Sequence, residues 1–195
     1  MAISRLIVGI TGASGAVYGQ RILQALKVAG VESHLVISRS AQITIAHELR
    51  ISPSEISALA DVSYRIEDIG AVISSGSFKT EGMIIAPCSI RTLSEIACGV
   101  TSNLVSRAAD VVLKERRKLV LMVRETPLHL GHLRTMTQAA EIGAILMPPV
   151  PAFYALPETI DAMVDHTVGR ALDLFGIDTN LVKRWGEDVG LGKRS

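Results

Sequence analysis

Small and hydroxyl-bearing residues are concentrated in the segment GITGASG at residues 9–15, directly after an apolar run. Glycine and alanine let backbone N–H groups approach an anion closely, and the Ser14 hydroxyl adds a hydrogen bond. The glycine spacing matches neither the GxGxxG of dinucleotide-binding folds nor the GxxxxGK[ST] of nucleoside-triphosphate loops. The segment predicts an anion site, and the alternative is a tight strand-to-helix turn that binds no ligand.

Four more apolar runs are followed by hydroxyl-bearing, charged or proline-rich segments. Ser38 follows residues 34–37, Ser89 and Thr92 follow residues 83–86, Arg124 and Glu125 follow residues 119–123, and PPVPAFY with Tyr154 follows residues 144–147. Ligands of open α/β sheets bind beyond the carboxyl ends of parallel strands. Convergence of five strand ends on one edge, with serines at two helix starts, favours a mononucleotide.

The elements that must position these residues can be read from periodicity. The five apolar runs, at 6–10, 34–37, 83–86, 119–123 and 144–147, are continuous, as in parallel strands covered on both faces. Helices are expected at 18–29, 38–49, 89–98, 103–116, 131–142 and 157–175, with Pro157 in a first turn. The alternation predicts a doubly wound, mainly parallel α/β sheet in a flavodoxin-like or Rossmann-like three-layer subunit. Residues 50–82 are predicted only as a short helix near 53–60 and then irregular chain.

The whole-chain composition limits the class of protein. A length of 195 residues predicts a single domain, and a formal net charge of +1 gives no general attraction to nucleic acid or membranes. Two cysteines, no signal-peptide pattern and no apolar stretch of spanning length predict a cytoplasmic location. The mean hydropathy of +0.36 is high for a monomer, which favours a homo-oligomer.

Five motifs in order resemble the UbiX-type flavin prenyltransferases. They are GITGASGA, PCSIRTL, RAADVVLKERRKLVLMVRETPLH, PPVPAFY and RWGE, which span residues 6 to about 187. The resemblance implies an FMN-binding subunit of a dodecamer, with a tail from about residue 176 that packs on neighbouring subunits. It also implies transfer of a dimethylallyl group from dimethylallyl phosphate to N5 and C6 of reduced FMN. The product would be the prenylated flavin that UbiD-type decarboxylases use as cofactor.

The resemblance also implies roles for individual residues. Residues expected to contact FMN are Gly12, Ala13, Ser14, Ser38, Ser89, Ile90, Arg91, Thr92 and Arg124. Residues expected to hold the prenyl donor are Arg107, Lys114, Tyr154, Arg170 and Trp185. Those expected near the reacting centre are Ser14, Glu48, Glu125 and Lys114, with a glutamate or the released phosphate taking the C6 proton.

Simpler interpretations of these residues remain open from sequence. Arg124 suits an ion pair with Glu125 or another carboxylate, the charge run around Lys114 suits a solvated helix end, and Glu48 suits a helix surface. Trp185 suits packing against a neighbouring subunit, or cation–π stabilisation of positive charge together with Tyr154.

A metal site is not expected. The chain has no DDxxD motif for a magnesium diphosphate, and His129 and His132 lack an evident third ligand. Cys88 is interpreted as a small buried residue rather than as a nucleophile.

Two other classes of flavoprotein are alternatives. An FMN-dependent cysteine decarboxylase shares the subunit fold, but its PxMNxxMW-type clamp is replaced here by PPVPAFYALP. A non-catalytic flavodoxin-like carrier would usually be strongly acidic, and this chain is close to neutral.

Overall fold

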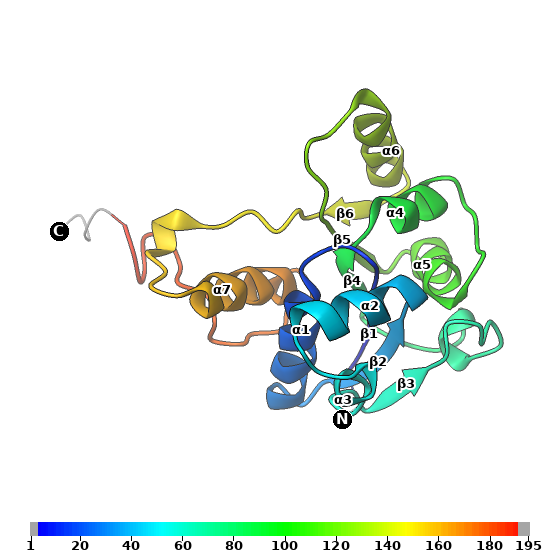
Figure 1. Cartoon of the computed structure of the whole chain (residues 1–195), viewed down its shortest axis with the longest axis horizontal. Coiled ribbons are helices and arrows are strands. Elements are labelled where there is room, and N and C mark those ends of the chain that lie inside the picture. The colour runs from blue at the N-terminus through cyan, green and yellow to red at the C-terminus, as the bar shows by residue number, and fades with distance from the viewer. Residues whose placement is uncertain (1–3, 191–195) are drawn as a thin grey trace.

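The computed structural model describes residues 4–190 and contains a six-stranded sheet in which all neighbouring strands are parallel (Figure 1). The strands are β1 (Arg5–Ile10), β2 (Glu32–Ile37), β3 (Val62–Tyr64), β4 (Gly82–Cys88), β5 (Lys118–Val123) and β6 (Ala144–Leu146). The α-helices are α1 (Ala16–Val28), α2 (Arg39–Glu48), α3 (Pro53–Ser57), α4 (Ile90–Ala97), α5 (Leu104–Lys114), α6 (Leu130–Glu141) and α7 (Ile160–Asp173), and the 3-10 helices are η1 (Val72–Ser74) and η2 (Phe153–Ala155).

The strand order is β3-β2-β1-β4-β5-β6, which is the order of the Rossmann fold. Without the short edge strand β3, the remaining five strands follow the flavodoxin-like order. The predicted doubly wound α/β subunit is therefore confirmed. In both orders the topological switch lies between β1 and β4, the two central strands.

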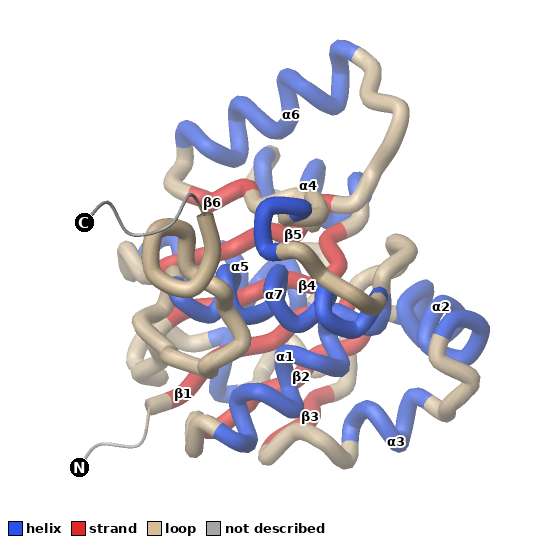
Figure 2. The backbone as a smooth tube through the Cα atoms, turned by 90° about the vertical axis from the view of Figure 1, so that its left-hand side faces the viewer, coloured by secondary structure: helices blue, strands red, loops and turns tan. Residues whose placement is uncertain are grey.

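Helices cover both faces of the sheet, which explains the continuous apolar runs (Figure 2). On one face α1 and α7 pack against the strands, with Leu23 and Leu172 in a cluster that includes Val8. On the other face α4 and α5 pack through Leu93 and Val112. All seven residues of β4 are buried, as expected for a central parallel strand.

Two sequence predictions need correction. A third strand, β3, lies within residues 50–82 and extends the sheet beyond β2, where only a short helix and irregular chain were predicted. It has three residues, none of them buried, so its periodicity was too weak to detect. Pro157 is not in the first turn of α7, because that helix begins at Ile160 and Thr159 caps it through the backbone N–H of Ala162.

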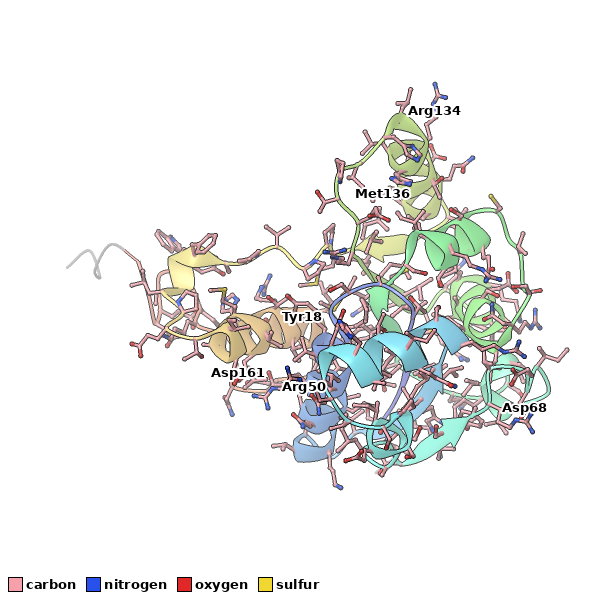
Figure 3. All side chains as sticks on the ribbon, viewed as in Figure 1. Tyr18, Arg50, Asp68, Arg134, Met136 and Asp161 are labelled. Carbon is pink, nitrogen blue, oxygen red and sulfur yellow. The ribbon has the colours of Figure 1, made fainter. Side chains whose placement is uncertain are left out.

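Two parts of the chain project from this body (Figure 1). Ala139 is the one buried residue of α6, and Figure 3 shows Arg134 extending from the outer end of that helix. The second part is the segment 147–159 between β6 and α7, which we call the arm. Phe153 and Leu156 of the arm are 70% and 72% exposed. No described helix is both long and apolar enough to cross a lipid bilayer.

Candidate functional site

The loops after β1 and β4 meet at the topological switch and are joined by a buried threonine. Thr11, 1% exposed, donates its hydroxyl to the Pro87 carbonyl at 2.8 Å. The same hydroxyl accepts the backbone N–H of Ser89 at 2.8 Å. The chain then turns toward opposite faces of the sheet, into α1 and into α4. This is the place where open α/β sheets bind ligands.

A groove of about 770 Å³ opens beside this junction, between the first turns of α2 and α4. We call it the α2–α4 groove. Its lining residues are Ser38, Arg39, Ser40, Ile43, Ile66, Glu67, Ile69, Ser89, Arg91, Thr92, Glu95, Ser102, Asn103 and Val105. Four residues predicted to bind flavin, Ser38, Ser89, Arg91 and Thr92, thus line one groove. Gly12 flanks it, because a Cβ at that position would collide with the Ser40 side chain.

The start of α4 retains backbone donors for an anion. The first N–H groups of a helix have no partner within that helix. Ser89, which caps α4, accepts the Thr92 N–H on its Oγ at 3.3 Å, and its own N–H goes to Thr11. The N–H groups of Ile90 and Arg91 are left for a ligand.

The start of α2 repeats this arrangement. The Oγ of Ser38 accepts the Ala41 N–H at 3.2 Å, and the Ser38 N–H donates to the Ile10 carbonyl at 2.9 Å. This leaves the N–H groups of Arg39 and Ser40. Two positive helix ends give the α2–α4 groove the character of a phosphate site. Arg39 and Arg91 also line it, each paired with a glutamate of the groove, Glu67 at 2.6 Å and Glu95 at 3.0 Å.

The start of α1 is occupied by the protein itself. Glu48, the last residue of α2, places its Oε2 at 2.9 Å from the backbone nitrogens of both Gly15 and Ala16. The sequence predicted an anion at this helix start, and the anion found there is the Glu48 carboxylate. A bound phosphate is therefore expected at the starts of α2 and α4 instead. Glu48 is exposed, as the helix-surface interpretation holds, but its carboxylate accepts two backbone hydrogen bonds rather than facing only solvent.

The surroundings of Glu48 keep it ionised. Burial acts to raise the pKa of this carboxyl, but hydrogen bonds from Ala16, Gly15 and the Ser14 hydroxyl outweigh that effect. The positive charge of Arg124 adds to them, so the pKa of Glu48 is lower than usual. The structure thus brings three predicted residues together, and Glu48 is a weaker base than an ordinary glutamate.

Arg124 and Glu125 follow β5 without pairing with each other. The Arg124 backbone N–H donates to the Cys88 carbonyl at 3.1 Å, which ties the ends of β5 and β4 together. The Glu125 carboxylate accepts the backbone N–H of Thr126 at 3.1 Å. Among residues 4–190 no ion pair joins the two side chains. The exposed Arg124 guanidinium acts on Glu48 instead.

Two predicted aromatic residues of the donor site meet beside α7. The ring of Tyr154, in η2 of the arm, is edge-on to Trp185 with centroids 5.8 Å apart. It is also edge-on to His166 of α7 at 5.6 Å. Trp185 is 63% exposed. The described part of the C-terminal tail packs on its own α7, where Leu181 and Val182 contact Gly169, and residues 191–195 lie outside the described chain.

The predicted cationic residues of the donor site lie away from the groove in the same subunit. Lys114 ends α5, four residues before β5 begins, and its Nζ is 2.7 Å from Glu115. Arg170 lies in the last turn of α7 and pairs with Asp173 at 2.8 Å. That turn is near the starts of the strands, since Lys118 at the start of β5 donates to the Leu174 carbonyl.

Neither Lys114 nor Arg170 lines the groove, although Lys114 lines a smaller hollow with Glu95, which also borders the groove. The groove lies beyond the carboxyl ends of the strands, and a six-residue strand is about 20 Å long. Arg107, in the first half of α5, is paired with Asp110 at 2.9 Å and does not line the groove.

The histidines and the central cysteine have structural contacts. The rings of His129 and His132 stack with centroids 3.5 Å apart, and the Nδ1 of His129 caps α6 by accepting the His132 N–H at 3.3 Å. Burial strongly raises the pKa of Cys88, which keeps it a thiol. Within residues 4–190 no three metal-ligating side chains are grouped closely enough to hold an ion.

Sequence reasoning missed several residues of the groove. Arg39 forms an ion pair with Glu67 at 2.6 Å that joins α2 to the loop after β3. That loop also contributes Ile66 and Ile69, and it falls in the segment that carried no periodic signal. Thr11 had a usable signal, because a hydroxyl directly after a buried strand needs a partner.

The chain is similar in sequence and fold to known flavoproteins. Residues 1–172 match the protein family described as Flavoprotein. The flavin prenyltransferase UbiX of Salmonella typhimurium is 61% identical over 184 residues, which cover 93% of this chain and 97% of that protein. The structure of AnUbiX (PadA1), in complex with FMN and dimethylallyl pyrophosphate, matches with a TM-score of 0.95 and 48% identity. The match covers 98% of this chain and 100% of that one.

Other solved structures separate the alternatives. A dodecameric FMN-dependent UbiX-like decarboxylase from Escherichia coli O157:H7 matches with a TM-score of 0.90 and 51% identity, over 93% of this chain and 98% of that one. The cysteine decarboxylase TvaF is 18% identical with a TM-score of 0.60, over 76% of this chain and 91% of that one, and shares the fold alone. The cysteine decarboxylase alternative is thus not favoured. By sequence identity over nearly its full length, this chain belongs to the UbiX family of flavin prenyltransferases.

Proposed function

We propose that this protein joins a dimethylallyl group to reduced FMN, with the flavin phosphate held in the α2–α4 groove. The observation that carries the assignment is the pair of helix starts, α2 and α4, that line one groove with unused N–H groups. A dianionic phosphate matches this set of donors. The relatives reported above bind FMN or are named as flavin prenyltransferases, which supports the same substrate here.

The reacting edge of the flavin belongs near Ser14, Glu48 and Arg124. Gly12 and Ala13 lead from the groove to Ser14, and small residues there leave room for a planar ring. Glu48 holds the Ser14 hydroxyl and the start of α1, and its negative charge stabilises a cationic dimethylallyl group.

The transfer breaks the C–O bond between the dimethylallyl group and phosphate as C1 of that group bonds to flavin N5, which loses its proton. The prenyl double bond then takes up a proton at C2, and C3 bonds to flavin C6, which loses its proton. Because the pKa of Glu48 is lowered, the C6 proton is better taken by Glu125 or by the released phosphate.

The donor phosphate is held by residues that other subunits supply. Lys114 and Arg170 do not line their own groove, so we assign them, with Arg107, Tyr154 and Trp185, to the grooves of neighbouring subunits. The exposed aromatic and aliphatic residues of the arm and of α6 fit burial between subunits. The E. coli relative is a dodecamer, and we propose the same assembly here.

The prenylated flavin would serve a second enzyme as its cofactor. We propose that a UbiD-type decarboxylase receives the prenylated flavin. We also place the reaction in the cytoplasm, where an exposed free thiol such as that of Cys98 persists.

The proposed reaction is tested by mass analysis of the flavin. The oligomer is incubated without oxygen with reduced FMN and dimethylallyl phosphate, and the flavin is then released. The expected product is FMN heavier by one dimethylallyl group less one proton, together with inorganic phosphate. Unmodified FMN, under conditions where the protein binds flavin, contradicts the proposal. A parallel reaction with dimethylallyl pyrophosphate identifies the preferred donor.

A further inference from the structure

A buried hydroxyl outside the groove, that of Thr11, is hydrogen-bonded to the residues that lead into α4. Thr11 follows β1, and three hydrogen bonds tie it to the segment after β4. Its Oγ1 donates to the Pro87 carbonyl at 2.8 Å and accepts the Ser89 N–H at 2.8 Å. Its backbone N–H donates to the same Pro87 carbonyl at 3.2 Å.

These bonds continue the connection between β1 and β4 where the sheet ends. The paired residues of the two strands stop at Gly9 and Ile85. Beyond that point each chain segment turns to its own face of the sheet, so the two loops would otherwise be independent. Thr11 therefore sets the position of the start of α4 relative to the glycine-rich loop.

The backbone N–H of Ser89 links the Thr11 hydroxyl to the start of α4. Because Thr11 takes this N–H, Ser89 is oriented so that its own Oγ caps the Thr92 N–H at 3.3 Å and donates to the Thr92 hydroxyl at 3.1 Å. The N–H groups of Ile90 and Arg91 stay available in the first turn of α4. The Thr11 side chain is 1% exposed and does not line the groove, so it does not bind the flavin itself.

We propose that Thr11 is a positioning residue for the flavin phosphate: its hydroxyl fixes the start of α4 so that the Ile90 and Arg91 N–H groups meet the phosphate. This inference rests on the proposed placement of FMN in the α2–α4 groove. It predicts that loss of the Thr11 hydroxyl weakens the binding of FMN through its phosphate and not through its flavin ring.

The test compares FMN with riboflavin, which has the same ring and no phosphate. Thr11→Val keeps the shape and removes the hydroxyl. We expect its dissociation constant for FMN to rise about tenfold, the equivalent of one hydrogen bond, while that for riboflavin stays within about twofold. The KM for reduced FMN should rise similarly and the KM for the prenyl donor should not. Thr11→Ser keeps a hydroxyl and should restore most of the FMN affinity.

Thr167→Val is the matched control. Thr167 is also a buried threonine, whose hydroxyl donates to the Met163 carbonyl at 2.8 Å within α7, and its loss should leave FMN affinity unchanged. If Thr11→Val does not fold, Thr11→Cys, with its weak thiol donor, should weaken FMN binding several-fold and riboflavin binding little.

Three results overturn the inference. They are FMN affinity at the wild-type level in folded Thr11→Val, equal losses for FMN and riboflavin, and failure of Thr11→Ser to recover. The proposed function is judged separately, because wild-type protein that binds FMN and does not prenylate it refutes the function and leaves the Thr11 comparison intact.

Discussion

The α2–α4 groove and the projecting parts of this molecule differ in how far one subunit completes them. At the groove, residues distant in sequence meet: Ser38, Ser89 and the loop after β3 line one hollow, and Thr11 joins the strand ends. In α6 and the arm, large apolar side chains such as Leu130 and Phe153 are 60% and 70% exposed.

The difference indicates that the groove and the projecting parts serve different binding steps. In the proposed account, flavin binding belongs to the folded subunit, because the backbone donors of the groove are positioned by the subunit's own sheet. Binding of the prenyl donor belongs to the assembly in this account, because Lys114 and Arg170 do not line the groove of their own subunit. A variant in either region can therefore be assayed for FMN binding and for prenyl transfer separately.

The largest effect is expected at the groove. Ser89→Leu removes the cap of α4 and places an aliphatic side chain among the phosphate donors. FMN affinity should fall by about a hundredfold or more, measured by fluorescence of the flavin at equilibrium. Thr159→Leu removes the cap of α7 instead and should leave FMN affinity unchanged. FMN affinity that falls equally in both variants would show that the loss is general destabilisation.

A smaller effect, limited to transfer, is expected at Arg170. Arg170→Ala should retain FMN binding and lose at least tenfold in prenyl transfer at limiting donor, because one charge-assisted contact to phosphate is lost. Raising the donor concentration should recover part of the rate. Arg184→Ala is the control, since Arg184 pairs with the same Asp173 at 3.0 Å. Loss of FMN in Arg170→Ala, with normal transfer at saturating flavin, would place Arg170 in the flavin site.

The smallest effect is expected on the acid stability of Glu48→Gln. The pKa of Glu48 is lowered in the folded protein because the backbone and Ser14 hydrogen bonds, with Arg124, outweigh burial. Its contribution to stability is therefore complete above the usual glutamate pKa of about 4.3 and is lost as the pH falls through the lowered value. The melting temperature of Glu48→Gln should lie below wild type at neutral pH, and the gap should close in acid.

Glu55→Gln separates this effect from function. The pKa of Glu55 is also lowered, by the backbone N–H and hydroxyl of Ser52 in the cap of α3. The melting temperature of Glu55→Gln should depend on pH in a similar way, and its prenyl transfer should be unchanged. Glu48→Gln should lose both stability at neutral pH and prenyl transfer. A gap between Glu48→Gln and wild type that widens in acid would contradict the assigned sign.

Much of the fold was predictable, because each central strand is a continuous apolar run and each run ends in a change of residue type. β3 was not predictable, since three half-exposed residues at a sheet edge have no detectable period. In the site, Ser38 and Ser89 were predictable as hydroxyl residues that cap helices after strands. The contact of Glu48 with the start of α1 was not, because it depends on how α2 lies across the sheet edge.

The division between groove and assembly is tested most directly by mixing two defective subunits. Ser89→Leu and Arg170→Ala chains with different tags are co-expressed, and oligomers that contain both are purified and assayed for prenylated FMN. If the groove and Arg170 of one site come from different subunits, about a quarter of the sites in a random mixture are intact, and activity should rise well above that of either variant. Activity no higher than the average of the two variants, in oligomers shown to contain both, would mean that each subunit supplies its own Arg170 and would contradict the account.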